Sequence, residues 1–281
     1  MSHAKLLATA ASVPRGFDLD AHLEQGGVAF RRGGKIVLRA QKLVSPPLLK
    51  EATIEIRAGE IVGLAGLIGS GRSELAQTIF GVAPLESGTI EVEGRAVQIR
   101  RPEDAIALGI AYVPEDRQRQ GLISAMTVAQ NIGLTRLWQL MRGPFLDPEA
   151  EDKLARQYID TLRIRTPSSR QITRNLSGGN QQKVVLAKWL ATKPRLLIVD
   201  EPTRGIDVGA RAEIHRLLDS LARDEGMAIL VISSDLPEVL RISDRICVMR
   251  EGYLVAEIKR KDATQETVLG AAIGQRGNGN D

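Results

Sequence analysis

The sequence predicts an α/β protein with a mainly parallel central sheet. The first observation is an apolar run, Ile61–Ala65, that leads into a glycine-rich loop and then into a helical pattern ending at Phe80. The second is another apolar run, Leu196–Val199, that ends in two acids. The third is a predominantly helical block over residues 127–165, between the two runs. Apolar runs alternating with helical segments are typical of buried parallel strands joined by crossover helices.

The composition indicates a folded chain and does not select its ligand. A length of 281 residues suits one large domain or two small ones, and a hydrophobic content of 43% is sufficient for a sizeable core. The formal charge of +4 and the pI near 9.3 permit an acidic ligand, nucleic acid or an anionic membrane surface alike. The only cysteine, Cys247, excludes an internal disulfide and lies in an apolar run, so we predict a core residue. No stretch approaches the roughly 18 apolar residues that span a bilayer, and any membrane association is expected to be peripheral.

The pattern changes after residue 34. Residues 1–34 have no clear periodicity, and we predict a leader or linker that is partly disordered. Residues 35–281 are predicted to form one domain, in which Ala52–Arg57 alternates and so exposes one face. The elements expected before the helical block are strands Lys35–Arg39, Ala52–Arg57 and Gly88–Gly94, a helix Pro102–Leu108 and a strand Gly109–Val113.

The helical block indicates a subdomain inserted into the α/β chain. An amphipathic helix is expected over Met126–Leu140, a break at Gly143–Pro144 and a new helix from Asp147–Pro148. Core packing is favoured over partner contact for Trp138 and Trp189. The elements expected after Leu176 are strands Arg195–Val199, Ala228–Ile232 and Arg245–Met249, and helices Gly179–Leu190, Ala210–Arg223, Pro237–Arg241 and Thr264–Ile273. His215 falls on one of these helices without a partner at metal-ligand spacing, and we interpret it as non-catalytic.

The glycine-rich loop, Gly66–Ser73, has the order expected of a phosphate-binding loop, with Arg72 in place of the usual lysine. Its glycines let backbone amides converge on phosphate oxygens, and the following helix adds the positive end of its dipole. Arginine keeps the charge but is longer, planar and forked, so the exchange is not conservative. The candidate ligand-binding residues of the loop are Gly66, Gly69, Ser70, Gly71, Arg72 and Ser73, with the Ser73 hydroxyl available to Mg²⁺. The alternative is a strand–helix turn that binds nothing.

Two acids, Asp200 and Glu201, close the second apolar run. In a parallel sheet, ligands gather at the carboxyl ends of the strands. Asp200 is therefore predicted to hold Mg²⁺, through water, and Glu201 to orient or deprotonate an attacking water. The alternative is that two acids simply end a strand.

A third motif, Leu176–Lys183, places Ser177, Gly178 and Gly179 at the start of a helix. As bare chemistry this is an anion-binding helix N-terminus or only a helix cap. The residue order of the motif and its distance of 23 residues (200 − 177) from the acid pair are more specific signals than the helix start alone.

With these three motifs, the chain resembles an ABC-transporter ATPase from about residue 35 to 274. Gly66–Ser73 corresponds to Walker A, Leu196–Glu201 to Walker B, and LSGGN at Leu176–Asn180 to the ABC signature. Pro202–Asp207 is the D-loop region, and Asp207 is assigned to the nucleotide site. The resemblance implies ATP and Mg²⁺ as cofactors. It also implies a P-loop NTPase fold with an antiparallel β subdomain and a helical subdomain inserted at about 116–180.

A finer resemblance is to the second nucleotide-binding half of ribose, galactose and xylose importers. It is carried by Tyr112–Arg117, LSGGNQQK, DEPTRGIDVGA and Ser233–Glu238. It implies an ATPase that couples ATP hydrolysis to sugar transport at the cytoplasmic face of the cell membrane, as a separate subunit or a fragment. The implied partners are permease subunits, a second ABC half bound head to tail and, indirectly, a periplasmic or extracellular sugar-binding protein. Nucleic acid is not expected.

The chain departs from the general ABC pattern at its own nucleotide site. Arg72, Glu115 and Ser234 stand where lysine, a Q-loop glutamine and a switch histidine are usual, and Ile36–Glu60 holds no adenine-stacking aromatic. Glu115 would bring negative charge near a polyphosphate, which is relieved only if Mg²⁺ or an arginine such as Arg117 offsets it. The resemblance thus implies a degenerate own site, in which Glu201, Ser234 and Glu115 occupy the catalytic positions, and an intact signature that completes a partner's site.

Two other functional hypotheses stay open. One is a nucleotide-responsive module without turnover, which completes another subunit's ATPase site. The other is a non-transport ABC ATPase of DNA repair or translation, which the modest basic charge permits but no strand-binding pattern supports.

Overall fold

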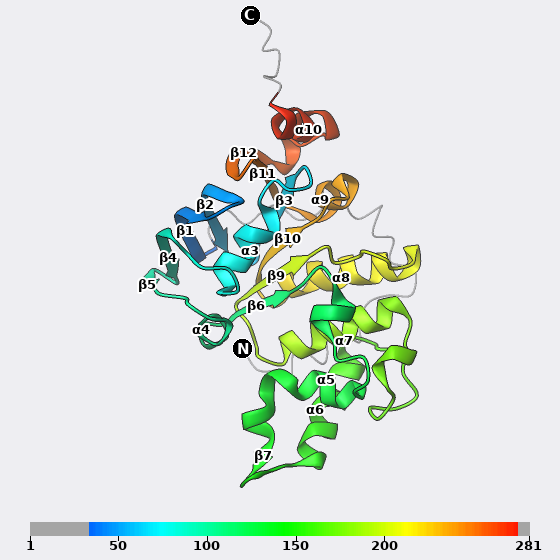
Figure 1. Cartoon of the computed structure of the whole chain (residues 1–281). Helices are drawn as coiled ribbons and strands as arrows, with labels where there is room; N and C mark the ends of the chain where they lie inside the picture. Colours follow the sequence, from blue (N-terminus) through cyan, green and yellow to red (C-terminus); the bar gives the residue numbers. More distant parts are fainter. Residues whose placement is uncertain (1–33, 275–281) are drawn as a thin grey trace, which may run out of the picture.

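The computed structural model describes residues 34–274, so the predicted leader lies, apart from Gly34, outside the described residues (Figure 1). Ten strands form one sheet in the order β5-β4-β1-β2-β12-β11-β3-β10-β9-β6, and β7 and β8 form a separate hairpin. The strands are β1 (Ile36–Ser45), β2 (Leu49–Arg57), β3 (Ile61–Gly66), β4 (Ser87–Val92), β5 (Arg95–Val97), β6 (Ile110–Val113), β7 (Met141–Arg142), β8 (Phe145–Leu146), β9 (Leu196–Asp200), β10 (Ala228–Ile232), β11 (Arg245–Arg250) and β12 (Tyr253–Lys259).

The helices cover both faces of the parallel strands. They are α3 (Arg72–Phe80), α4 (Pro102–Ala107), α5 (Val128–Gly133), α6 (Pro148–Thr161), α7 (Gly178–Leu190), α8 (Val208–Arg223), α9 (Leu236–Ile242) and α10 (Gln265–Ile273). Short helical segments are η1 (Arg117–Gly121), η2 (Leu134–Leu140), η3 (Thr173–Asn175) and η4 (Arg260–Asp262). Among the described residues, none of these helices is long and apolar enough to cross a membrane.

The sheet has an antiparallel part and a parallel part. Strands β5, β4, β1 and β2 pair antiparallel, whereas β11, β3, β10, β9 and β6 pair parallel. Within the described residues, the two parts meet where β2 lies beside β12, at the pair Tyr253 and Glu51. The predicted fold class is therefore confirmed: a mainly parallel sheet carries an additional antiparallel region.

Alternate residues of the parallel strands enter different cores, which explains their continuous apolar runs. On β9, Leu196 and Ile198 pack with α3 and the antiparallel strands, whereas Leu197 and Val199 pack with α5, α6, α7 and α8. Figure 1 shows α5 and α6 at one end of the molecule and α10 at the other. Cys247 is 1% exposed, which confirms the predicted core position.

The predicted helix Met126–Leu140 is wrong in its second half. Thr127 caps α5 with a reciprocal capping box, but the α-helix ends at Gly133 and continues as the 3₁₀ segment η2, with non-helical φ at Arg136. The change of helical geometry turns Trp138 outward to 85% exposure, so the prediction of a core tryptophan is wrong there. Trp189 does pack inside, edge-on to Phe80 with ring centroids 5.4 Å apart.

Several strands differ from the prediction, among them β1 and β12. β1 was expected to end at Arg39 but runs to Ser45, because a register shift between Ala40 and Leu43 breaks its alternation. β12 was not predicted, although it alternates exposed and half-buried residues and follows a turn at Gly252.

Candidate functional site

The phosphate-binding loop connects β3 to α3 as the sequence predicts. Gly71 is the N-cap of α3 with a left-handed φ of 97°, a conformation that L side chains rarely adopt. The loop is open at its tip, where Leu67, Ile68 and Gly69 are exposed, and buried at its base. Ser70 Oγ is buried there without a hydrogen-bond partner among residues 34–274. A helix N-terminus with an unpartnered hydroxyl beside it suits an anionic ligand.

Arg72 is buried beside this loop, with 9% exposure. Its Nη1 donates to the carbonyl oxygen of Ser233 at 2.7 Å, just beyond the carboxyl end of β10. The guanidinium therefore already binds backbone. A lysine ammonium in the same place would carry one compact charge instead of a fork with several donors.

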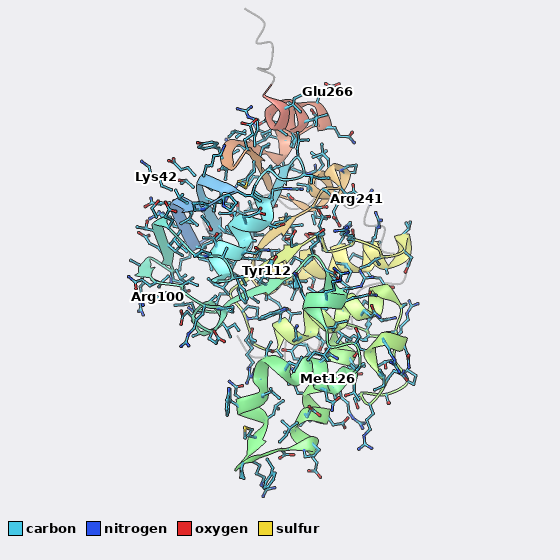
Figure 2. The ribbon with its side chains drawn as sticks, in the orientation of Figure 1. Lys42, Arg100, Tyr112, Met126, Arg241 and Glu266 are labelled. Carbon is cyan, nitrogen blue, oxygen red and sulfur yellow. The ribbon has the colours of Figure 1, made fainter. Side chains whose placement is uncertain are left out.

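Asp200 ends β9 next to the loop and lies 1% exposed. Tyr112 donates its hydroxyl to Oδ2 of Asp200 at 3.2 Å; Figure 2 labels this tyrosine near the middle of the molecule. Burial raises the pKa of Asp200 to about 6, and hydrogen bonding from Ser73 and Tyr112 opposes this rise. Burial also raises the pKa of Tyr112 above its usual range, so the phenol stays a donor.

The oxygens at this place fit a divalent cation. Ser73 and Asp200 interact, and both offer the hard oxygen ligands that Mg²⁺ prefers. Oδ1 of Asp200 is buried and has no hydrogen-bond partner within the described part of the chain. A bound cation would satisfy this oxygen and offset the cost of burying the carboxylate.

The raised pKa of Asp200 leads to a testable stability effect. The folded pKa is about 6 against an ordinary 3.8, so the folded state holds the proton longer and stability falls as pH rises between these values. Asp200→Asn removes this loss. As the pH rises from 4 to 7, we expect the stability of nucleotide-free Asp200→Asn relative to wild type to increase by on the order of 2–3 kcal/mol.

Urea unfolding at pH 4 and pH 7 without Mg²⁺ checks this expectation. Asp104→Asn is a matched control, because a backbone hydrogen bond from Arg100 holds the pKa of Asp104 below its usual range and reverses the sign. A stability difference between Asp200→Asn and wild type that does not change with pH would contradict the prediction.

Glu201 and Ser234 lie side by side because their strands are neighbours. Asp200 pairs with Ile232 in the parallel register of β9 and β10, which brings the residues that follow them together. Oε1 of Glu201 accepts a hydrogen bond from the backbone N–H of Ser234 at 2.6 Å. The contact at the predicted switch position is thus made by the backbone, and the Ser234 residue is exposed.

The charge of Glu115 is offset by an arginine other than Arg117. Its carboxylate pairs with Arg204 in the D-loop. Arg117 donates instead to the carbonyl oxygens of Arg204 at 2.6 Å and Gly205 at 3.2 Å. The segment after β6 and the D-loop are therefore joined by both arginines, and the Arg204 guanidinium offsets the charge of Glu115.

The signature motif forms the N-terminus of α7. Ser177 is its exposed N-cap and accepts a hydrogen bond from the side chain of Asn180 at 2.9 Å. A Cβ added at Gly179 would lie 2.5 Å from the Cβ of Ala210, so glycine is needed for α7 to approach α8. Asp207 caps α8 through the backbone N–H of Ala210 at 2.9 Å and is also exposed.

The structure adds residues that the motifs did not identify. Tyr112, Arg204, Thr203, His215 and Glu238 lie around the predicted site residues. His215, which the sequence predicts to be non-catalytic, has its Nε2 2.6 Å from Glu238 Oε1. The signal for Tyr112, Thr203, Arg204 and Glu238 was present, because each falls within a quoted family motif, but motif order alone gives none of their contacts.

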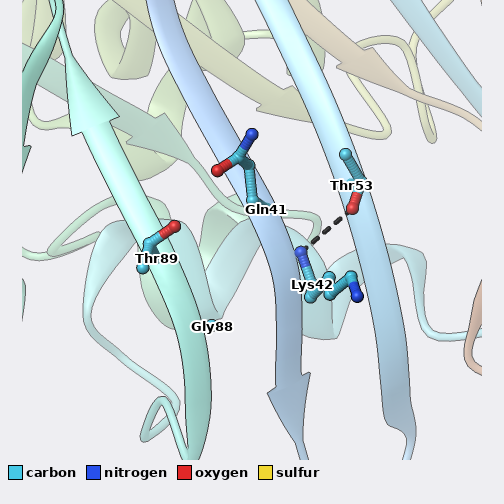
Figure 3. A pocket seen from close by; sticks show the side chains of 5 residues that line it. All are labelled: Gln41, Lys42, Thr53, Gly88 and Thr89. Atoms are coloured by element: carbon cyan, nitrogen blue, oxygen red, sulfur yellow. Dashed lines mark hydrogen bonds between the residues drawn. The ribbon is translucent and has the colours of Figure 1, made fainter.

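A separate pocket lies on the antiparallel strands. It has a volume of about 360 Å³ and is lined by Gln41, Lys42, Thr53, Gly88 and Thr89 (Figure 3). The backbone N–H of Lys42 donates to the hydroxyl of Thr53 at 2.9 Å. None of these residues is among the predicted site residues, so the candidate site is the one assembled around the phosphate-binding loop.

Comparisons with known proteins agree with the motifs. Residues 49–204, more than half of the chain, match the model of the family described as "ABC transporter". The ribose import ATP-binding protein RbsA 2 of Streptomyces avermitilis is 49% identical over 244 residues, which are 87% of this chain and 48% of that protein. A putative ribose/galactose/methyl galactoside import ATP-binding protein of Rhizobium etli is 48% identical over 241 residues, 86% of this chain and 46% of that one.

Solved structures show the same fold. An ATP-binding cassette of an ABC transporter in its ADP conformation has a TM-score of 0.71 and 24% identity, over 85% of this chain and 99% of that chain. The chain spans about half the length of the curated relatives it matches. Since the family model covers more than half of the chain, including the phosphate-binding loop, the signature and the acid pair, the chain belongs to the ABC transporter family.

Proposed function

We propose that this chain is the ATP-binding component of an ABC-type sugar importer, in which ATP binding and hydrolysis drive carbohydrate uptake. The observation that carries the proposal is the convergence of Ser73, Asp200 and Glu201 at the phosphate-binding loop. The sugar class is supported by relatives named as ribose and galactose import proteins. The partners proposed are permease subunits at the cytoplasmic face of the membrane, a second ABC half and, through the permease, a sugar-binding protein.

In this proposal each residue has a defined role. The loop amides of Gly66–Ser73 and the N-terminus of α3 bind the phosphates of ATP. Ser73 and, through water, Asp200 hold Mg²⁺, which when bound offsets the charge of the transferring phosphoryl group. Glu201 orients or deprotonates the attacking water, and the N–H of Ser234 holds the Glu201 carboxylate in place.

The proposed cycle is asymmetric between the two ABC halves. Arg72 is committed to the Ser233 carbonyl and Glu115 to Arg204, so the chain's own site is proposed to bind Mg-ATP weakly or turn it over slowly. Ser177 is exposed at the N-terminus of α7, so the signature is proposed to complete the nucleotide site of the other half. Closure of this head-to-tail pair on ATP would then move the permease.

A second function is a nucleotide-responsive module without turnover. The contact of Arg72 with a protein carbonyl favours it, because a guanidinium held by backbone is less available to phosphate. Retention of Glu201 beside Asp200 favours the enzyme. The two functions differ in whether Glu201 contributes to ATP hydrolysis.

The test is Mg-ATP binding and turnover by the purified chain, alone and with a first-half ATPase domain of a sugar importer. We expect binding with slow turnover alone and stimulation by the partner. Glu201→Gln is expected to lower turnover by the chain alone about tenfold or more, because general base catalysis contributes 10²- to 10⁴-fold. An unchanged rate would support the module, and fast wild-type turnover without a partner would contradict the asymmetry. Absence of nucleotide binding in both settings would overturn the proposed function.

A further inference from the structure

A buried polar cluster lies behind the phosphate site. Its centre is Glu238 on α9, which is 5% exposed. Oε1 of Glu238 accepts a hydrogen bond from the Thr203 hydroxyl at 2.7 Å and lies 2.6 Å from Nε2 of His215. Oε2 accepts a hydrogen bond from the Ser233 hydroxyl at 2.6 Å. One carboxylate therefore joins the D-loop, α8 and the loop after β10.

This carboxylate is well satisfied as an anion. Burial alone would raise its pKa, but hydrogen bonds from His215, Ser233 and Thr203 hold the pKa of Glu238 below its usual range. Short charge-assisted bonds of this kind fix their partners in position. Buried charged groups often add little stability over apolar side chains of the same size, so stability by itself is a weak reason for a carboxylate here.

The Ser233 side chain fixes a peptide group that faces the catalytic positions. The peptide between Ser233 and Ser234 accepts a hydrogen bond from Arg72 Nη1 through its carbonyl at 2.7 Å. The same peptide donates its N–H to Oε1 of Glu201 at 2.6 Å. Since C=O and N–H are rigidly opposed in a planar trans peptide, one orientation satisfies both contacts, and rotation of the peptide plane would break both.

We propose that Glu238 is a positioning residue for Glu201. Glu238 holds the Ser233 hydroxyl, this sets the plane of the Ser233–Ser234 peptide, and the peptide N–H orients the Glu201 carboxylate. Thr203 brings the D-loop into the same cluster, so a displaced D-loop would release the peptide as well. The inference rests on the proposed ATPase function only for its kinetic consequence, because the positioning itself is a property of the folded chain.

Hydrogen–deuterium exchange at the Ser234 amide, followed by NMR in the full chain, tests the positioning directly. Ser233→Ala removes the hydroxyl that Glu238 holds, and with it the acceptor of the Asp235 backbone N–H at 3.1 Å. We expect Ser234 to exchange roughly fivefold to tenfold faster, as for the loss of one hydrogen bond. Ser243→Ala is the matched control, because Ser243 is equally buried but its hydroxyl has no partner among the described residues.

Two further variants extend the test through the cluster. Thr203→Val removes only the D-loop contact and is also expected to accelerate exchange at Ser234, which a purely local role of Thr203 would not do. Glu238→Gln keeps the size of the side chain and removes its charge, and it is expected to give the largest acceleration. Unchanged exchange at Ser234 in both Ser233→Ala and Thr203→Val would overturn the proposal, even if Glu238→Gln failed to fold.

Steady-state ATP turnover tests the kinetic consequence of the proposal. In Ser233→Ala we expect kcat of the chain to fall roughly fivefold, since Glu201 is misoriented. Faster exchange with an unchanged kcat would contradict the role toward Glu201. Absence of turnover in the wild-type chain, alone and with a partner half, would instead count against the proposed function, while exchange still decides whether Glu238 orders the peptide.

Discussion

Replacing Ser177 by arginine is expected to abolish the stimulation of ATP turnover when this chain is paired with a second ABC half. Ser177 is the exposed N-cap of α7, and its hydroxyl contacts Asn180 of its own helix. An arginine there fills the space over the helix N-terminus where the partner's nucleotide would bind. Loss of such a preorganised donor lowers turnover by at least about a hundredfold.

The measurement is steady-state turnover of the mixed halves, together with Mg-ATP binding to this chain alone. Binding to the chain's own loop is expected to stay unchanged, because Ser177 makes no hydrogen bond to Gly66–Ser73 in the described structure. Thr264→Arg is the matched control, because Thr264 is the N-cap of α10 and lies far from the signature in sequence. This variant also removes a helix cap, which costs about 1 kcal/mol of stability. Full stimulation by Ser177→Arg would rule out the trans-acting role.

Removal of the Glu60 carboxylate is expected to have the largest effect on stability. Glu60 is 1% exposed, and its Oε1 accepts a hydrogen bond from Nε of Arg245 at 2.7 Å. Its Oε2 accepts the backbone N–H of Arg57 at 2.9 Å. Glu60→Ala leaves Arg245 buried with fewer counter-charges, which costs about 3 kcal/mol, the lower end of the range for a broken buried pair, since Glu257 still pairs with this arginine.

Urea unfolding of the nucleotide-free chain measures this loss. Glu257→Ala is the control, because Glu257 also pairs with Arg245 but is 56% exposed, and its removal is expected to cost less than about 1 kcal/mol. The double variant Glu60→Met/Arg245→Met is expected to recover most of the stability, because neither charge is then left unpaired. Equal losses in Glu60→Ala and Glu257→Ala would show that the Glu60 carboxylate is not buried as described.

The parallel half of the sheet was predictable because its strands are buried on both faces. A run such as Ala228–Ile232 is apolar throughout, and the strand matches the predicted range. β12 carried a usable signal, since Tyr253–Lys259 alternates after a turn glycine. η2 carried no such signal, because its amphipathic spacing is that of an α-helix. In the folded chain it forms a 3₁₀ segment that leaves Trp138 exposed, which depends on tertiary packing.

The site was predictable where the chemistry is local to a motif. The loop, the acid pair and the helix cap at Ser177 each occupy one short segment, and the order of these segments identified the family. The ion pair of Glu115 with Arg204 joins residues 89 positions apart (204 − 115), and the cluster around Glu238 joins three elements. Contacts of this kind depend on how loops approach one another, which residue patterns along the chain do not encode.

The contrasting surroundings of the two tryptophans give the chain two separable fluorophores. Trp138 is 85% exposed, so a soluble quencher would reach it freely. Trp189 is half-buried against Phe80, the last residue of the helix that begins at the phosphate-binding loop. In Trp138→Phe, all remaining tryptophan emission would come from Trp189, because the sequence contains only these two tryptophans. Its intensity and emission maximum would then report the packing of α3 as nucleotide binds, with no dye attached to the protein.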